Sequence, residues 1–378
     1  MTEIYLDNAA TTPMLDSVID VMTDAMKNTF GNASATNRLG QDARKLVDDA
    51  RHEIATFIGA KDGEIIFTSG ATEGNNTVIK GISNLNPGKK IITTAIEHPS
   101  VLRPMEEAAA NGHEIIYLSV DQAGCINFDE LREKLTDDVA LVSVMAVNNE
   151  VGSVNPLKEI GQIVHESNAL FHVDAVQGIG NLKLDVNDLQ VDFMTTSAHK
   201  INGPKFLGFL YVRDGVKLPA LILGGEQENK RRAGTENVPA IAGFGQAIKE
   251  LKKVDFDQEQ KMYASFQDII LNKLKNDKIE YEVNGGKGSN HVLNLWIKSV
   301  ATSLLQTRLD LEGFAVSAGS ACTAGAVTPS HVLTAMFGDS ARVRESIRIS
   351  FGRLTTTEEV TTFAEELANL SKKFQIKE

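Results

Sequence analysis

Short apolar runs alternate with longer amphipathic stretches between residues 38 and 213 of the chain. Each apolar run is rich in β-branched residues and bounded by turn residues, which is typical of a buried strand. The runs are Ile65–Ser69, Lys90–Thr94, Glu114–Leu118, Ala140–Val147, Leu170–Val173 and Asp192–Thr196. The amphipathic stretches predict helices at Arg38–Ile58, Thr72–Gly81, Val101–Asn111, Phe128–Leu135 and Leu157–Ser167. This alternation predicts an α/β fold, with a mainly parallel sheet covered by helices on both faces.

The pattern changes toward the C-terminus. Gly208–Arg213 follows the preceding strand after a loop too short for a crossover helix, so we expect an antiparallel neighbour. Beyond about Gly243 the sequence predicts a long charged helix over Ala247–Lys275, interrupted near Asp255. Further strands are expected at Tyr281–Val283 and His291–Ile297, and helices at Ser303–Glu312 and Thr357–Lys373. We expect an arm over residues 1–15 that packs with the small domain, a large domain over 16–250 and a small α+β domain over 251–378.

Composition excludes several classes of protein. Hydrophobic residues make up 42% and charged residues 23% of the chain, as in ordinary globular proteins. The net charge of −12 argues against a general nucleic-acid binder, because phosphate binding needs an excess of cations. Only two cysteines occur, Cys125 and Cys322, and they form neither a disulfide framework nor a CxxC metal site. With no signal peptide or membrane span in the pattern, we expect a cytoplasmic protein that holds no metal and contacts no membrane.

Polar residues follow several predicted strands, at the sheet edge where ligands bind in such folds. The run Ile65–Ser69 leads through Gly70 into Ala71 and Thr72, where a helix is expected to start. Backbone N–H groups at a helix start, together with the Thr72 hydroxyl, suit a phosphate group. The alternative is a plain turn capped by the threonine.

Two further strand ends carry side chains that are candidates for cofactor binding or catalysis. Asp174 ends the run Leu170–Val173, and a partly buried carboxylate there suits a protonated ring nitrogen; the alternative is an N-cap for the next helix. Lys200 follows the run Asp192–Thr196 behind Ser197 and His199. A desolvated amine becomes a Schiff-base nucleophile, although most lysines lie on the surface. A phosphate turn, a strand-end Asp and a strand-end Ser-x-His-Lys in this order are the parts of a pyridoxal phosphate site.

Three other residues are candidates. His98 follows the run Lys90–Thr94 and suits ring stacking, although a lone histidine is more often structural. Cys322 lies among small residues, so we expect a mobile, exposed thiol rather than a buried structural cysteine; Cys125 is interpreted as structural. Arg348 shares one face of the alternating run Ser-Ile-Arg-Ile-Ser with two serines, and its guanidinium suits a carboxylate. The alternative is an ordinary surface arginine.

With these residues in this order, the sequence resembles the pyridoxal-phosphate-dependent cysteine desulfurases of the NifS/IscS type, within the class V aminotransferase group. The matching stretches are YLDNAATTP, TSGATEGNN, EHPSV, VNNEVG, HVDAVQGIG, SAHKINGPK, RRAGTENV, SAGSACTAG and SIRISFGR, which span Tyr5 to Arg353. The resemblance implies the fold type I of pyridoxal phosphate (PLP) enzymes, with a seven-stranded sheet in the large domain.

The resemblance also implies how PLP is held. Lys200 would be joined covalently to the cofactor, Asp174 would pair with its ring nitrogen, and Gln177 would bond its ring hydroxyl. His98 would stack on the ring and take part in catalysis, and Asn149 would border both cofactor and substrate. The phosphate group would be held by residues of two strand ends, which are Ala71, Thr72, Ser197 and His199.

Substrate, partner and assembly follow from the same resemblance. Asn149 and Arg348 would hold the carboxylate of L-cysteine, and Cys322 would accept its sulfur as a persulfide. Thr235 would reach the phosphate in the other subunit's site, which implies a homodimer. The sulfur would pass to an acceptor protein for iron–sulfur cluster assembly or for tRNA or cofactor thiolation, with no direct contact to nucleic acid. The sequence does not identify the acceptor.

Two alternatives remain open. Another class V enzyme, an aminotransferase or a selenocysteine lyase, would share the cofactor site, although the Cys322 stretch argues against a transaminase. A non-catalytic sulfur-delivery scaffold is suggested by Ala33, Ala35 and Asn37, which depart from the GNPSSxHxxG pattern usual in relatives. The usual proline and histidine are missing there, so any role of that histidine is lost.

Overall fold

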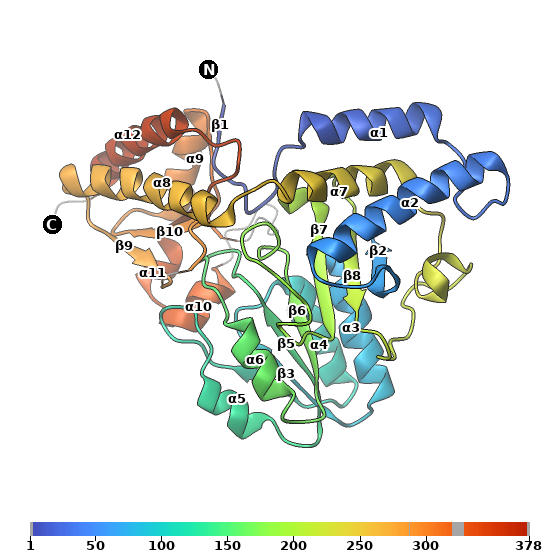
Figure 1. Ribbon diagram of the computed structural model, residues 1–378. Coiled ribbons are helices and arrows are strands. Elements are labelled where there is room, and N and C mark those ends of the chain that lie inside the picture. Colours follow the sequence, from blue (N-terminus) through green and yellow to red (C-terminus); the bar gives the residue numbers. More distant parts are fainter. Residues whose placement is uncertain (1–2, 287, 320–328, 376–378) are drawn as a thin grey trace.

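The computed structural model describes residues 3–286, 288–319 and 329–375. A seven-stranded sheet forms the centre of the larger of two lobes (Figure 1). In spatial order the strands are β2 (Ile65–Thr68), β8 (Gly208–Val212), β7 (Phe193–Ser197), β6 (Leu170–Asp174), β5 (Val139–Met145), β3 (Lys90–Thr94) and β4 (Ile115–Leu118). Neighbours are parallel except at β8, which is antiparallel to both β7 and β2. The predicted parallel sheet and its antiparallel strand are therefore confirmed.

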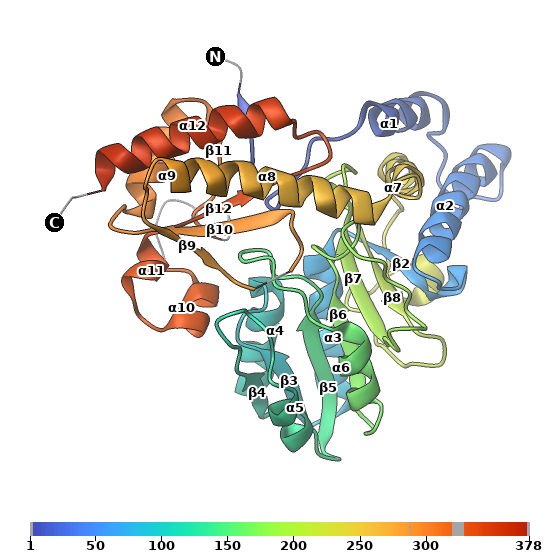
Figure 2. The same ribbon diagram turned by 60° about the vertical axis from the view of Figure 1, so that its left-hand side comes forward.

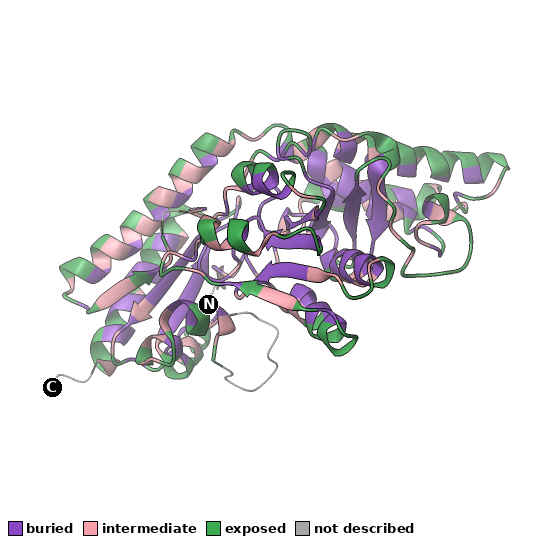
Figure 3. Ribbon diagram, turned by 90° about the horizontal axis from the view of Figure 1, so that it is seen from below, coloured by how far each residue is buried: buried purple, intermediate pink, exposed green. Residues whose placement is uncertain are grey.

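Helices bury both faces of this sheet. On β2, Ile65 and Phe67 pack into one apolar cluster while Ile66 packs into another, because successive side chains of a strand point to opposite faces. Helices α2, α6 and α7 contribute to the first cluster, and α3 and α4 to the second. The helices of this lobe are α1 (Asp16–Asn28), α2 (Arg38–Phe57), α3 (Ala71–Leu85), α4 (Pro99–Ala110), α5 (Phe128–Lys134), α6 (Leu157–Val164) and α7 (Val238–Leu251). Figure 3 shows buried strands between helices whose outer faces are exposed.

The smaller lobe has its own sheet and core. Its antiparallel strands lie in the order β12 (Ser346–Ser350), β10 (Val292–Ile297) and β9 (Tyr281–Asn284). Its helices are α8 (Phe256–Asn276), α9 (Thr302–Leu311), α10 (His331–Phe337), α11 (Ala341–Arg344) and α12 (Thr357–Phe374). Helices α8 and α12 lie side by side in Figure 2 and pack against each other. Phe266, Leu293, Ile349 and Phe363 belong to the core that they share with the sheet.

The long helix expected over Ala247–Lys275 is two helices, which corrects that prediction. Helix α7 starts much earlier, after Asn237, whose side chain accepts a hydrogen bond from the Ala240 amide. It ends at Leu251, and α8 begins after Asp255, whose carboxylate accepts from the amides of Asp257 and Gln258. An N-cap of this kind starts a new helix, so the interruption is a complete break.

The N-terminal arm, defined here as residues 3–15, connects the two lobes. Strand β1 (Ile4–Tyr5) pairs in parallel with β11 (Phe314–Ala315), and Leu6 is buried in the small-lobe core. Farther on, the amide of Leu15 donates to the carbonyl oxygen of Asn202 in the large lobe. The arm thus passes between the lobes. No helix in the described part of the chain is long and apolar enough to cross a membrane.

The stretch that departs from the family pattern has a structural role. Asn37 is the N-cap of α2, and its side-chain oxygen accepts a hydrogen bond from the Gly40 amide at 3.0 Å. A Cβ atom on Gly40 would lie 2.3 Å from the carbonyl oxygen of Ala35, so only glycine fits there. The three departures at Ala33, Ala35 and Asn37 therefore accompany a well-capped helix start.

Candidate active site

A cavity of about 250 Å³ lies where the arm and both lobes meet. Ten of the twelve candidate residues line it: Ala71, Thr72, His98, Asn149, Asp174, Gln177, Ser197, His199, Lys200 and Arg348. Thr235 lies elsewhere, on a second cavity of about 150 Å³ beside Ser69 and Arg232. Cys322 falls outside the described residues. The structure thus brings together residues that the sequence separates by up to 277 positions (348 − 71).

The phosphate turn has the expected local form. Strand β2 leads into Gly70, whose φ of +148° is available to glycine, and α3 starts at Ala71. The Ala71 amide donates to the Ser197 hydroxyl at 2.9 Å, which joins this turn to the end of β7. An anion here would face the N-terminal end of a 15-residue helix. His199 lies beside it with its Nδ1 atom 3.0 Å from the Thr11 hydroxyl.

The Asp174 carboxylate is held by donors of the large lobe. It is buried at the end of β6 and accepts hydrogen bonds from Asn75 Nδ2 at 2.8 Å and from the Val176 amide at 3.1 Å. Asn75 also donates to Ser100 Oγ at 2.9 Å and accepts from Thr195 Oγ1 at 2.5 Å. Because a turn rather than a helix follows Asp174, the N-cap alternative is wrong.

His98 and Lys200 point into the same cavity. His98 Nδ1 accepts from the Ser100 amide at 3.1 Å, so the proton of the neutral ring is on Nε2. Burial is the main cause that lowers the pKa of His98, and it lowers the pKa of His199 to about 4, so both rings are neutral near pH 7. The Lys200 ammonium donates to the carbonyl oxygens of Ala9 and Ala10 at 2.6 Å each. It lines a cavity, unlike a surface lysine.

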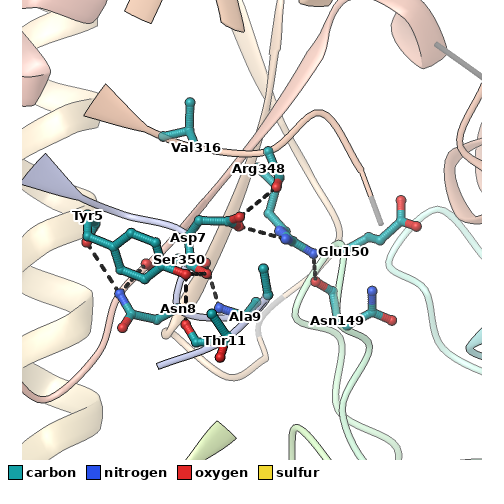
Figure 4. Close-up of polar contacts among 12 residues, drawn as sticks. Tyr5, Asp7, Asn8, Ala9, Thr11, Asn149, Glu150, Val316, Arg348 and Ser350 are labelled. Carbon is teal, nitrogen blue, oxygen red and sulfur yellow. Dashed lines mark hydrogen bonds and ion pairs between the residues drawn. The ribbon is translucent and has the colours of Figure 1, made fainter. Parts of the chain in front are cut away.

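Arg348, on strand β12 of the small lobe, is fully buried, with 1% of its residue surface exposed. Figure 4 shows its side chain directed toward Asp7 and Asn149. Its neighbours Ile347 and Ile349 point into the small-lobe core, as the alternating pattern predicts. Its Nη2 atom lies 2.7 Å from Asp7 Oδ1, and Nη1 donates to the Asn149 carbonyl oxygen at 2.9 Å. Its buried Nε–H has no partner among the described residues. The surface-arginine alternative is therefore wrong.

The aminotransferase class-V family model matches residues 4–363 of the chain. A Bacillus subtilis (strain 168) protein whose name is IscS 1 is 49% identical over 378 residues, which cover 99% of this chain and 100% of that protein. The cysteine desulfurase IscS of Dictyoglomus turgidum is 40% identical over 377 residues, covering 99% of this chain and 95% of that protein. The chain belongs to the cysteine desulfurases of the NifS/IscS type, within the class-V aminotransferase family.

The fold of this chain is similar to solved structures of NifS-like proteins and of SspA. A NifS-like protein superposes with a TM-score of 0.92 at 33% identity, covering 98% of this chain and 100% of that one. SspA in complex with cysteine superposes with a TM-score of 0.82 at 34% identity, covering 93% of this chain and 99% of that one. The PLP-enzyme fold implied by the sequence is therefore confirmed.

The cavity fits the PLP that enzymes of this family use. It presents a primary amine for covalent attachment, a buried carboxylate for a ring cation and a helix N-terminus for a phosphate. It also presents a buried guanidinium with an unpartnered donor, within the described chain, for a substrate carboxylate.

Sequence reasoning missed several residues of this NifS/IscS-type site. Asp7 and Asn75 lie inside stretches that carried the family resemblance, which was the available signal. Glu150 follows Asn149, and its Oε2 atom accepts from Ser330 Oγ at 2.5 Å. A Cβ atom built on Gly319 would lie 3.3 Å from the same oxygen, so Glu150 adjoins the described residues on both sides of Cys322.

Proposed function

We propose that this chain is a PLP-dependent cysteine desulfurase, which converts L-cysteine to L-alanine and leaves the sulfur on Cys322 as a persulfide. The observation that carries the proposal is the shared cavity. Lys200, Asp174 and Arg348 line it together, and each suits one part of the reaction. No such combination is needed in a scaffold that only delivers sulfur.

PLP, when bound, supplies an electron sink for the charge that develops on the substrate α-carbon. Asp174 would hold the ring nitrogen in its charged form, and Gln177 would donate to the ring oxygen. His98, a neutral ring on the cavity wall, would stack on the cofactor ring. The phosphate group would be held by residues beside the start of α3, namely Ala71, Thr72, Ser197 and His199.

Arg348 and Asn149 bind the cysteine carboxylate, and the buried guanidinium gives that contact its strength. The Lys200 amine takes the α-proton as the general base and returns it during formation of the product. The Cys322 thiolate attacks the substrate sulfur: a sulfur–sulfur bond forms and the carbon–sulfur bond breaks. The electron pair of the broken bond stays with the substrate carbon, which is protonated to give alanine.

Assembly and delivery belong to the same proposal. Thr235 serves the site of a second copy, so the working form is a homodimer. Leu221, Ile222 and Leu223 are exposed hydrophobic residues on the segment that leads to Thr235, and Phe206, beside the Thr235 cavity, is 80% exposed. A second copy would cover this apolar surface. The persulfide then passes to a cytoplasmic acceptor protein of iron–sulfur assembly or tRNA thiolation.

The domain division is proposed with bounds at residues 15 and 250. The small-lobe core draws on residues from Tyr263 to Leu370 and on Leu6 of the arm, which supports an arm that packs with the small domain. The large-lobe clusters draw on residues from Val18 to Leu251.

The test is to incubate the PLP-loaded protein with L-cysteine and to measure alanine and sulfide together. We expect equal amounts of both in the presence of a reductant. Cys322→Ser should still bind cysteine, seen as a change in the visible spectrum, but release no sulfide. Cys125→Ser is the matched control, because Cys125 is half-buried beside Asp121, away from the cavity.

Each outcome decides between the alternatives. Sulfide release unchanged in Cys322→Ser would remove that residue as the acceptor. Keto-acid formation from cysteine would favour an aminotransferase, and activity confined to selenocysteine would favour a selenocysteine lyase. Absence of alanine from loaded protein would favour the scaffold.

A further inference from the structure

A histidine of the small lobe contacts Gln177 of the large lobe. His291 immediately precedes β10 and is buried, and its Nε2 atom lies 3.0 Å from Gln177 Oε1. Its other ring nitrogen, Nδ1, lies 2.7 Å from the Ser289 hydroxyl. Gln177 also lines the main cavity, whereas His291 does not; the two residues line a smaller cavity of about 30 Å³ together with Lys200. The hydrogen bond from the histidine toward the main cavity runs to the glutamine.

Three hydrogen bonds link Ser289, His291, Gln177 and Ala9, and the direction of all three follows from one carbonyl group. The Ala9 carbonyl oxygen is an acceptor only, and Gln177 Nε2 donates to it at 2.9 Å. The other end of the amide, Oε1, must then accept, so His291 Nε2 carries the proton. His291 Nδ1 is therefore unprotonated and accepts from the Ser289 hydroxyl.

The electrostatics of the site keep this histidine neutral. Burial, and secondarily the charges of Arg348 and Lys200, lowers the pKa of His291 to about 3. A neutral ring has one donor and one acceptor nitrogen, which is what the chain from Ser289 to Gln177 requires. The ring can therefore hold one tautomer throughout the working pH range.

We propose that His291 is a positioning residue, which fixes the Gln177 amide so that its second Nε2–H faces the cavity and meets the ring oxygen of PLP. One of the two N–H groups of Gln177 is used by Ala9, and the second is the one left for the cofactor. This inference rests on the proposed function, because it takes the cofactor from there. It makes the orientation of a large-lobe side chain depend on the small lobe and on the arm.

The first test needs no cofactor. In the full chain without PLP, labelled with ¹⁵N-histidine, the ring-nitrogen shifts of His291 should show a neutral ring with its proton on Nε2 from pH 6 to pH 8. Loss of that signal in His291→Gln assigns it. A proton on Nδ1, or a charged ring, would overturn the proposal, even if the enzyme were a fully active desulfurase.

The second test uses the PLP-loaded protein and the pH midpoint of its visible absorbance change. A hydrogen bond from an N–H to the ring oxygen stabilises negative charge on that oxygen. The nitrogen joined to Lys200 then shares its proton less strongly with the oxygen, and its pKa is lower. Loss of the donor should therefore raise the midpoint. We expect His291→Leu to raise it by roughly 0.5–1 pH unit, as for loss of one such hydrogen bond.

Two further variants make the result specific. His291→Gln keeps an N–H donor, so its midpoint should stay within about 0.2 units of the unmodified protein. Gln177→Ala should shift the midpoint at least as far as His291→Leu, and the double variant should add nothing to Gln177→Ala, because both act through one amide. His165→Leu, on the exposed end of α6, is the control.

An unshifted midpoint in His291→Leu, or additive shifts in the double variant, would overturn the proposal. Failure of the proposed function would look different: the unmodified protein would bind no PLP or release no sulfide, while the tautomer measurement would still report on His291.

Discussion

The cavity has two walls that are built differently. The inner wall comes from the large lobe. Asp174 is the last residue of β6, Lys200 follows β7, and Asn75 links Asp174 to Ser100 and Thr195 through hydrogen bonds. The outer wall centres on Arg348, from the small lobe, and its charged partner Asp7 lies 341 positions away, on the arm. Asp174 is held by contacts within one lobe, whereas Arg348 is held by contacts between separate parts of the chain. Lys200 and Gln177, also of the inner wall, add contacts to Ala9 of the arm.

This difference assigns the walls different tasks. Groups that bond to the cofactor need fixed positions, and a sheet edge supplies them. The groups that we propose to bind the substrate lie on the side where the small lobe, the arm and the described residues flanking Cys322 meet. Substitutions in the inner wall should therefore abolish chemistry, whereas substitutions in the outer wall should weaken cysteine binding first.

The largest effect is expected from Lys200→Ala, in the inner wall. Because we propose Lys200 as both the covalent link to PLP and the general base, the rate of alanine formation should fall at least about 10³-fold. Borohydride reduction followed by mass spectrometry should find the cofactor mass on unmodified protein and not on the variant. Lys205→Ala, an exposed neighbour, is the control. A labelled variant would remove Lys200 from its assigned role.

A smaller effect on a different parameter is expected from Arg348→Lys, in the outer wall. Lysine keeps the charge but cannot contact Asp7, the Asn149 carbonyl and a substrate carboxylate with one planar group. The KM for cysteine should rise roughly 10–100-fold, with kcat changed much less. Arg344→Lys, exposed just before β12, is the control. A fall in kcat with constant KM would contradict this division between the walls.

A weaker effect is expected from Asp7→Asn. Asp7 Oδ1 contacts Arg348 and Oδ2 accepts from Ser317 Oγ at 2.8 Å, and asparagine can accept at only one of these positions. Arg348 should then lose its fixed orientation, and KM should rise about 3–10-fold. If Asp7 acted only as a rival of the substrate carboxylate, KM would fall instead. Asp20→Asn, on the exposed face of α1, should change nothing.

The inner wall was predictable from the sequence because strand ends are visible as the ends of apolar runs. Asp174 and Lys200 could be placed in this way, and Arg348 through the alternation with two isoleucines. The outer wall was not predictable to the same degree. The pairing of Asp7 with Arg348 depends on how the arm crosses between the lobes, which no local pattern encodes. His291 gave no signal at all, because a lone histidine next to an apolar run indicates no partner.

The break between α7 and α8 shows the same limit at the level of secondary structure. The stretch around Asp255 carried a visible signal, since an aspartate before a helical pattern is a typical N-cap. The sequence pattern predicts one charged helix over Ala247–Lys275 that is interrupted there. Which interpretation holds is decided by packing: α7 lies against α1 and α2, and α8 against α12.

A second buried carboxylate, Glu97, lies behind the inner wall, next to His98 in the sequence, and does not line the cavity; it differs from Asp174 in its partners. Its Oε1 atom accepts from the Met145 amide at 2.9 Å and from Thr94 Oγ1 at 2.7 Å, but its buried Oε2 has no partner within the described chain. Burial, and secondarily the charge of Asp174, raises the pKa of Glu97 to about 8. Glu97 is therefore protonated at neutral pH in the folded protein.

Glu97→Gln should change the pH dependence of stability without changing activity. The pKa of Glu97 in the folded protein, about 8, lies above that of a glutamate in the unfolded chain, about 4.3. The stability that the bound proton contributes is therefore fully present below about pH 4.3 and is lost as pH rises through about 8. Glutamine has the same shape as protonated glutamate and does not titrate.

Urea melts give the unfolding free energy of each protein. Between pH 5 and pH 8, the unfolding free energy of the unmodified protein should fall, relative to that of the variant, by an amount on the order of a few kcal/mol. Glu365→Gln, exposed on α12, is the control, and a constant difference would show that Glu97 is ionised in the fold.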